Sequence, residues 1–294
     1  MKPAPLDHAA PTTVGEAVAL LNDPEREAVA LAGGQSLMPM LNLRLARPDL
    51  LVDLTRIEGL DHIRESGGWI EMGAMATKRA VERSSLVRER QPMWHEATLQ
   101  IGHPQIRNRG TVGGSMAQAD PAAEYPAAAV ALGGEVKAVG PSGERTIPAT
   151  EFFLGYLTTA LAPGEILTEV RVPVLPPGRG WAFREVCRRH GDFAMAGTAV
   201  TVDLDASGRC TATRIALFGV GPVPSRAVEA EKIVDGEAPG EEVFERAGRA
   251  AAGAIDEPLA DVHASADYRR NLAAVLTGRA LAQAVTRAAR PEGS

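Results

Sequence analysis

The sequence predicts an α+β protein, in which an α/β N-terminal part is followed by a separate C-terminal α+β domain. Three observations lead to this prediction. Helix-like and strand-like stretches alternate within the first 55 residues. A proline-rich segment at residues 173–178 then interrupts the chain. Beyond it, three strand-like runs precede three alanine-rich helical patterns, an order typical of a separate domain.

Residues 1–57 are expected to form an N-terminal α/β lobe. Residues 13–22 carry apolar positions at helical spacing, and Thr13 followed by Glu16 predicts a capping box at the start of this helix. The next predicted elements are a short strand, an apolar helix-like stretch and a second strand, at residues 29–32, 37–45 and 50–54.

Residues 58–175 are expected to form a second α/β lobe. Hairpins are predicted at residues 60–73 and 135–148, and helices at 77–85, 91–100 and 121–132. A strand is predicted at residues 165–172. The stretch between residues 101 and 110 shows no regular period.

Residues 179–290 are expected to form the C-terminal α+β domain. A three-stranded antiparallel sheet is predicted from residues 181–187, 194–204 and 212–219. Helices are predicted at 224–233, 241–253 and 267–289, and the tail at 290–294 is expected to be disordered.

Composition excludes several classes of protein. The chain has 294 residues and a net charge of −6, so a nucleic-acid-binding surface is not expected. No apolar run reaches the roughly 18 residues that a membrane span needs. The N-terminus lacks the apolar core of a signal peptide, which favours a cytoplasmic location.

The chain contains two cysteines, Cys187 and Cys210, which are not paired in a CxxC motif. An iron–sulfur cluster usually needs four thiolates, so this chain cannot hold one alone. The histidines are scattered and none flanks a cysteine at ligand spacing, so no metal site is predicted.

The first candidate site is the Gly33-Gly34 pair, which follows an apolar run and precedes Gln35 and Ser36. Glycine lets a ligand come close to backbone N–H groups, and a turn of this kind can hold a phosphate. An ordinary strand-to-helix turn would look the same. The sequence is neither a P-loop nor a GxGxxG fingerprint, so a Rossmann dinucleotide site is not indicated.

A second Gly-Gly pair at residues 113–114 is preceded by Thr111 and followed by Ser115, about 80 residues after the first pair. The two turns together suggest that one diphosphate is held between two loops of N–H groups. Downstream, Asp120 is expected to cap a helix, and Glu124 either lies in its solvated first turn or accepts hydrogen bonds from sugar hydroxyls.

Arginines close to the second loop leave two interpretations open. Arg107 and Arg109 could neutralise a diphosphate, but such side chains more often form surface or inter-domain ion pairs.

The ordered set of motifs resembles the FAD-binding medium subunit of molybdenum hydroxylases, a group that includes the carbon monoxide dehydrogenase flavoprotein and xanthine dehydrogenase. The resemblance covers nearly the whole chain. It rests on the two glycine loops and on residues 38–45, 101–108, 120–124 and 191–194. Gln35 stands where relatives often carry His or Asn, and Val112 replaces a commoner Ile.

The resemblance implies a two-lobed FAD-binding domain of the PCMH type, similar to that of vanillyl-alcohol oxidase, followed by a carbon-monoxide-dehydrogenase-flavoprotein-type C-terminal domain. It places the FAD diphosphate at both glycine loops, Ile101 near the flavin, Leu167 beside the adenine, and Asp192 with Phe193 close to the isoalloxazine. The implied cofactor-binding residues are Leu31, Ala32, Gly33, Gly34, Gln35, Ser36, Leu37, Ile101, Arg109, Thr111, Gly113, Gly114, Ser115, Ala119, Glu124, Ile166, Leu167, Asp192 and Phe193.

The family also implies the function. A large partner subunit with a molybdenum cofactor oxidises the substrate, a small partner carries 2Fe–2S clusters, and the FAD of this chain passes electrons to an external acceptor. No catalytic residue of this chain is implied, and a dimer of heterotrimers is expected. A stand-alone FAD-dependent oxidoreductase of the same superfamily and a non-enzymatic scaffold are the alternatives. The substrate and the acceptor stay open.

Overall fold

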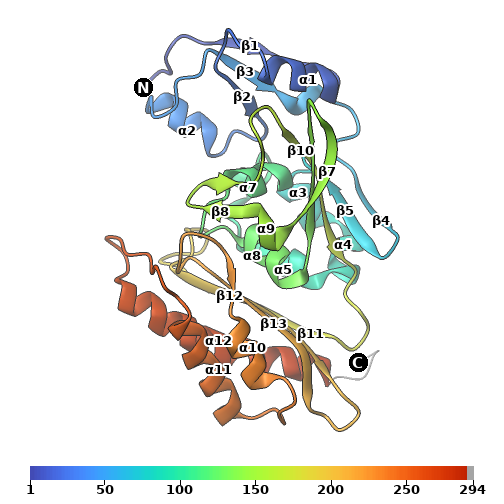
Figure 1. Ribbon diagram of the computed structural model, residues 1–294, viewed down its shortest axis with the longest axis vertical. Helices are drawn as coiled ribbons and strands as arrows, with labels where there is room; N and C mark the ends of the chain where they lie inside the picture. The colour runs from blue at the N-terminus through green and yellow to red at the C-terminus, as the bar shows by residue number, and fades with distance from the viewer. Residues whose placement is uncertain (290–294) are drawn as a thin grey trace.

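The structure is a computed structural model and describes residues 1–289. Figure 1 shows three parts stacked along the long axis of the molecule, with the N-terminal part at one end and the C-terminal part at the other. The tail at residues 290–294, for which disorder was predicted, lies outside the described residues. No helix within residues 1–289 combines the length and the apolar character needed to cross a bilayer.

The N-terminal part is a small parallel sheet with two helices. Its elements are β1 (Asp7–Ala9), α1 (Val14–Leu21), β2 (Ala28–Leu31), α2 (Leu37–Asn42), β3 (Leu50–Asp53) and the 3-10 helix η1 (Leu54–Arg56), and the strand order is β1-β3-β2. The predicted capping box is present, because Thr13 and Glu16 bond each other's backbone N–H groups. The three-residue β1 was not predicted, since so short a strand carries no periodic signal.

The middle part is built on a five-stranded antiparallel sheet. The strand order is β4-β5-β10-β6-β7, with β4 (Ile63–Ser66), β5 (Trp69–Gly73), β6 (Glu135–Gly140), β7 (Gly143–Pro148) and β10 (Ile166–Pro173). A short hairpin, β8 (Phe153–Gly155) and β9 (Thr158–Thr159), lies beside it. The helices are α3 (Lys78–Arg83), α4 (Ser85–Arg90), α5 (Pro92–Gln100), α6 (Pro104–Arg107), α7 (Val112–Gln118), α8 (Glu124–Leu132) and α9 (Ala149–Phe152).

Two predictions for the middle part are corrected. The second Gly-Gly turn is the first turn of α7, with Thr111 as its N-cap. The irregular stretch at 101–110 contains the one-turn helix α6, which His103 precedes. A helix this short has too few residues to show a hydrophobic period.

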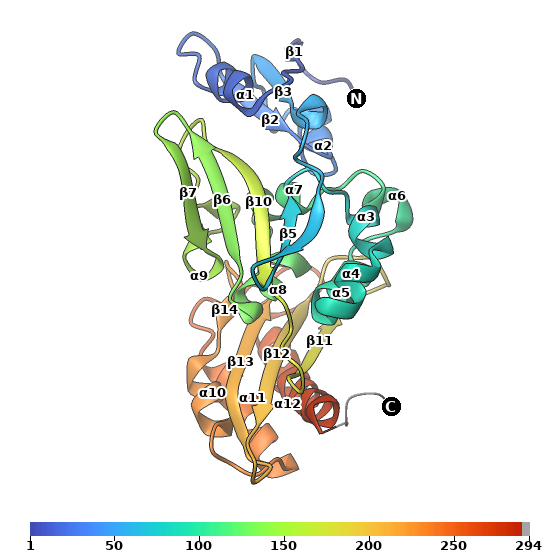
Figure 2. The same cartoon turned by 90° about the vertical axis from the view of Figure 1, so that its right-hand side faces the viewer.

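The core of the middle part extends to the C-terminal domain. The rings of Trp94 and Tyr125 stack with centroids 4.4 Å apart, and both side chains are fully buried. Every residue of α8 is buried, because it lies between the middle sheet and the C-terminal sheet. Figure 2 shows α8 at this junction.

The C-terminal domain has a four-stranded antiparallel sheet in the order β11-β12-β13-β14, where three strands were predicted. The strands are β11 (Gly180–Val186), β12 (Ala196–Leu204), β13 (Cys210–Phe218) and the two-residue edge strand β14 (Ser225–Arg226). The predicted helices are present as α10 (Val228–Val234), α11 (Glu241–Gly253) and α12 (Ala266–Ala288), which pack together and against this sheet. The first of them was expected to begin at residue 224, but residues 225–226 form β14 instead.

Candidate functional site

A cleft of about 510 Å³ lies between the N-terminal and middle parts. The segment that joins β11 to β12 also lines it, through Gly191, Asp192 and Phe193. All of the predicted site residues except Leu31, Arg109 and Ala119 line this cleft. The fold therefore brings together segments that lie up to 164 residues apart in sequence, from Val29 to Phe193.

The first glycine loop presents free backbone donors to the cleft. Among the described residues, no intramolecular acceptor contacts the N–H groups of residues 33–37. Gly34 has φ +71°, which turns the chain sharply between β2 and α2. Ser36 occupies the N-cap of α2, yet its hydroxyl makes no capping bond. Five consecutive residues with free amides, of which Ser36 also has a free hydroxyl, thus line the cleft and offer the donors that an anion site requires.

The second glycine loop differs, and the prediction of a second N–H cradle was wrong. The amides of Val112 and Gly113 donate to the carbonyls of Ala76 and Ala74, at 2.9 Å in each case. The amides of Gly114 and Ser115 donate to the hydroxyl and the carbonyl of Thr111, at 3.0 and 3.2 Å. All four donors are therefore already used inside the protein.

The glycines of the second loop allow close packing instead. A β-carbon on Gly113 would lie 2.5 Å from the Cβ of Ala74, and one on Gly114 would lie 2.8 Å from the Thr111 hydroxyl. Residues with side chains could not occupy these positions without displacing Ala74, which directly follows β5, or the cap of α7. The second loop forms a wall of the cleft, to which Ser115 adds a hydroxyl.

The two loops touch at Gly33. A β-carbon on Gly33 would lie 2.0 Å from the carbonyl oxygen of Arg109 and 2.8 Å from the Cα of Gly110. The N-terminal part therefore contacts the middle part by direct backbone packing, beside the free amides. A second cavity of about 500 Å³ lies on this junction and is lined by Arg56 and Arg109.

The three predicted residues outside the cleft have identifiable positions. Leu31 ends β2, and its Cδ1 lies 3.4 Å from the site of a Gly34 β-carbon, so it supports the first loop from behind. Ala119 is buried and forms the left-handed C-cap of α7, with φ +50°. Arg109 faces the second cavity.

Arg107 bonds to acceptors inside the protein and does not line the cleft. It is buried, its Nε donates to Glu82 at 2.9 Å, and its Nη1 donates to the carbonyls of Ile101 and Gly102 at 2.9 and 3.1 Å. It therefore fixes the backbone that carries Ile101 into the cleft.

Glu124 and Lys78 line the same cleft, and the sequence analysis missed Lys78. Glu124 is 5% exposed, and burial raises the pKa of its carboxyl to about 7, although the Lys78 ammonium opposes this shift. Lys78 could not be found from sequence because a single lysine at the start of a helix forms no motif.

Asp120 does not cap α8: Ala123 holds that position, and Asp120 accepts from the Ala122 amide at 2.9 Å.

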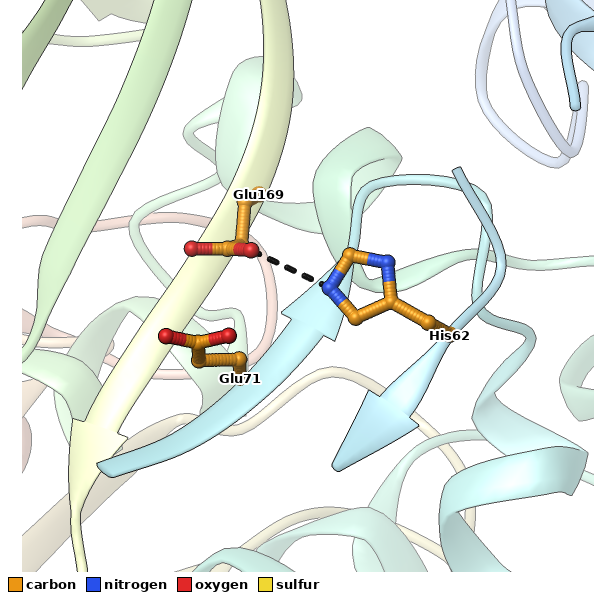
Figure 3. Close-up of side chains that lie close together, drawn as sticks. All are labelled: His62, Glu71 and Glu169. Atoms are coloured by element: carbon orange, nitrogen blue, oxygen red, sulfur yellow. Dashed lines mark hydrogen bonds and ion pairs between the residues drawn. The ribbon is translucent and has the colours of Figure 1, made fainter. Parts of the chain in front are cut away.

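Residues 1–289 include one group with metal-ligand spacing, formed by His62, Glu71 and Glu169 (Figure 3). Two cationic side chains already occupy the carboxylates: Arg64 Nε lies 2.8 Å from Glu71, and Lys137 Nζ lies 2.7 Å from Glu169. His62 Nε2 lies 3.1 Å from Glu169. The cluster is thus a charge-balanced network on the middle sheet, and a cation is not needed to neutralise it.

Two family models match the chain. A model described as the FAD binding domain in molybdopterin dehydrogenase matches residues 5–175, and one described as the CO dehydrogenase flavoprotein C-terminal domain matches residues 181–284.

Curated relatives and solved structures match over almost the full length. The chain is 42% identical to the 6-hydroxypseudooxynicotine dehydrogenase complex subunit alpha of Paenarthrobacter nicotinovorans, over 98% of this chain and 97% of that protein. It is 41% identical to the carbon monoxide dehydrogenase medium chain of Hydrogenophaga pseudoflava, over 98% of this chain and 100% of that protein. A solved structure of carbon monoxide dehydrogenase from the latter organism, which lacks the Mo-pyranopterin moiety, matches with a TM-score of 0.95 over 98% of this chain and 99% of that one.

Proposed function

Because the chain belongs to the family of FAD-binding medium subunits of molybdenum hydroxylases, we propose that it is the electron-transfer subunit of such a complex. It takes electrons from 2Fe–2S clusters in a small partner subunit and passes them through FAD to an external acceptor. A large partner subunit with the molybdenum cofactor oxidises the substrate. The complex is a cytoplasmic dimer of heterotrimers.

The observation that carries this proposal is the row of free amides at residues 33–37, which line a cleft between two parts of the chain. These donors suit the oxygens of a diphosphate. Ser36 and Ser115 add hydroxyl donors, and Glu124 provides an acceptor for the hydroxyls of a sugar or ribityl chain. Ile101 and Leu167 add apolar side chains to the lining of the cleft, which suit the flavin and the adenine.

The chain's own contribution is binding and shielding. FAD, when bound, supplies the redox chemistry of one- and two-electron transfer. The protein holds the dinucleotide between two rigid loops, and Phe193, which is 67% exposed, stands at the mouth of the cleft. No side chain is assigned a role as general acid or base. The two free cysteines, Cys187 and Cys210, are too few for an iron–sulfur cluster, which supports placing the clusters in a partner.

The substrate is selected outside this chain. Two relatives of nearly equal identity, 42% and 41%, are named for 6-hydroxypseudooxynicotine and for carbon monoxide, two compounds with nothing in common chemically. Relatives that are about equally similar to this chain thus belong to dehydrogenases named for different substrates. We assign substrate recognition to the large partner subunit.

Purification of the chain from its native host tests this function. We expect co-elution of two further chains, one FAD per copy of this chain, and cluster and molybdenum signals in electron paramagnetic resonance. Under anaerobic conditions, oxidisable substrate should bleach the flavin in the three-chain complex and leave it oxidised in the isolated chain. A chain that purifies alone and turns over a substrate without partners would overturn the proposal.

A further inference from the structure

We infer that Lys78 is a further cofactor-contacting residue, whose ammonium group pairs with the diphosphate of the bound dinucleotide. This inference rests on the proposed function and adds a residue that neither the motifs nor the glycine loops indicate. Lys78 lies at the start of α3, directly after the N-cap Thr77.

The charge of the cleft singles out Lys78. It is the one lysine or arginine among the described residues that line the cleft, whereas Asp120, Glu124, Glu165 and Asp192 all line it as acids. A diphosphate carries negative charge, so a cleft with four carboxylates and one ammonium needs that ammonium close to the phosphates.

The Lys78 side chain is largely buried and has no carboxylate partner among the described residues. The residue is 9% exposed, and within residues 1–289 no carboxylate oxygen lies within 4.0 Å of its Nζ. Its Nζ lies 5.7 Å from the centroid of the Tyr125 ring. Lysine is rarely buried unless it is paired, because an unpaired buried charge is costly. Burial lowers the pKa of Lys78, and Glu124 only partly offsets this.

The position of the side chain indicates which part of the ligand it meets. The Lys78 backbone N–H donates to the Gly110 carbonyl at 2.8 Å, and its Cδ lies 3.4 Å from the site of a Gly110 β-carbon. Gly110 in turn is the residue that Gly33 packs against. The Lys78 side chain therefore runs beside the junction where the free amides of residues 33–37 begin.

Binding measurements on the full chain test the pairing. Lys78→Met keeps the length of the side chain and removes its charge. We expect it to raise the Kd for FAD about 10- to 100-fold, as for the loss of a charge-assisted hydrogen bond. The Kd for riboflavin, which lacks phosphates, should stay unchanged, and Lys78→Arg should retain most of the affinity for FAD.

Three results overturn the inference. Equal FAD affinity in Lys78→Met and wild type excludes the contact. An equal loss for riboflavin and FAD places Lys78 at the flavin ring instead. A loss of apo-protein stability that Glu124→Gln restores makes Lys78 a counter-ion of Glu124 only. A wild-type chain that binds no FAD would sink the proposed function itself, a separate outcome.

A labelling experiment on the wild-type chain covers the case in which the variant does not fold. The chain has four lysines, Lys2, Lys78, Lys137 and Lys232, so acetylation can be followed at each by mass spectrometry. ADP and FAD should protect Lys78 from acetylation, and riboflavin should not. The other three lysines serve as internal references. Equal labelling of Lys78 with and without FAD would contradict the pairing.

Discussion

The carbonyl oxygen of Arg109 occupies the space in which a β-carbon of Gly33 would lie, at a separation of only 2.0 Å. One contact thus joins the first glycine loop to the segment that leads into the second. The cleft keeps its width because these two backbones touch. Gly33 does not have a left-handed φ, so its requirement for glycine is purely steric.

Gly33→Ala is therefore expected to separate the two loops and to lower FAD affinity. Overpacking of this kind typically costs about 1–3 kcal/mol, which corresponds to a loss of affinity of roughly 5- to 150-fold. Gly15→Ala is the matched control, because nothing lies within 4 Å of a β-carbon at that position. The FAD content of both purified variants is the measurement. Full FAD content in Gly33→Ala would show that the contact does not set the cleft.

Arg107 is expected to be important for stability through its buried pair with Glu82. Arg107→Met removes hydrogen bonds to Glu82 and to two carbonyls, and the loss of a hydrogen bond to a charged group typically costs about 1.5–3 kcal/mol. Arg79→Met is the control, because Arg79 contacts the same carboxylate at 2.8 Å but is 32% exposed. Its loss should cost about 1 kcal/mol or less. Denaturant unfolding of both variants measures the two losses in the free energy of unfolding. Equal losses would contradict a special role for Arg107.

Glu124 is expected to make the stability of the apo chain depend on pH. Its pKa rises from the ordinary 4.5 to about 7 on folding, so between these values the folded chain holds a proton that the unfolded chain has lost. The free energy of unfolding should therefore fall as the pH rises from about 4.5 to 7. Asp120 and Glu185, whose pKa values burial also raises, act in the same direction.

Glu124→Gln should flatten this dependence, because an amide does not titrate. The measurement is denaturant unfolding at a series of pH values for the wild type and the variant. Parallel curves for the two proteins would mean that Glu124 does not hold a proton in the folded chain.

Arg287 is expected to fix α12 to the middle part. Its guanidinium lies 3.6 Å from the centroid of the Trp181 ring, and its Nη2 lies 3.1 Å from Glu96. Arg287→Ala should lower the free energy of unfolding by about 1–2 kcal/mol. Arg249→Ala, which removes an exposed pair with Glu245, should leave Tm unchanged. Equal Tm values for Arg287→Ala and wild type would contradict this role.

The sequence predicted the family and the major elements, and the comparisons confirm the family. Periodicity and the glycine pairs carry that information locally. The different roles of the two loops could not be predicted, because the amides of the second loop bond to Ala74 and Ala76, almost 40 residues earlier in the chain. Only the folded chain shows that these donors are taken while those of residues 33–37 are free.

Lys78 could not be predicted from the sequence for a related reason. Its importance comes from its neighbours, Gly110 and Glu124, which lie 32 and 46 residues later in the chain and approach it only in the folded protein. The strand β14 was missed because two residues are too few to show a period. What sequence reasoning could not supply was in each case a long-range contact or a very short element.

The central claim is that the free amides of residues 33–37 hold the cofactor, while those of residues 112–115 are already bonded. Hydrogen–deuterium exchange of the full chain with and without FAD tests it directly. We expect FAD to slow exchange strongly at residues 33–37, and residues 112–115 to exchange slowly in both states. Unchanged exchange at residues 33–37 on FAD binding would contradict the account.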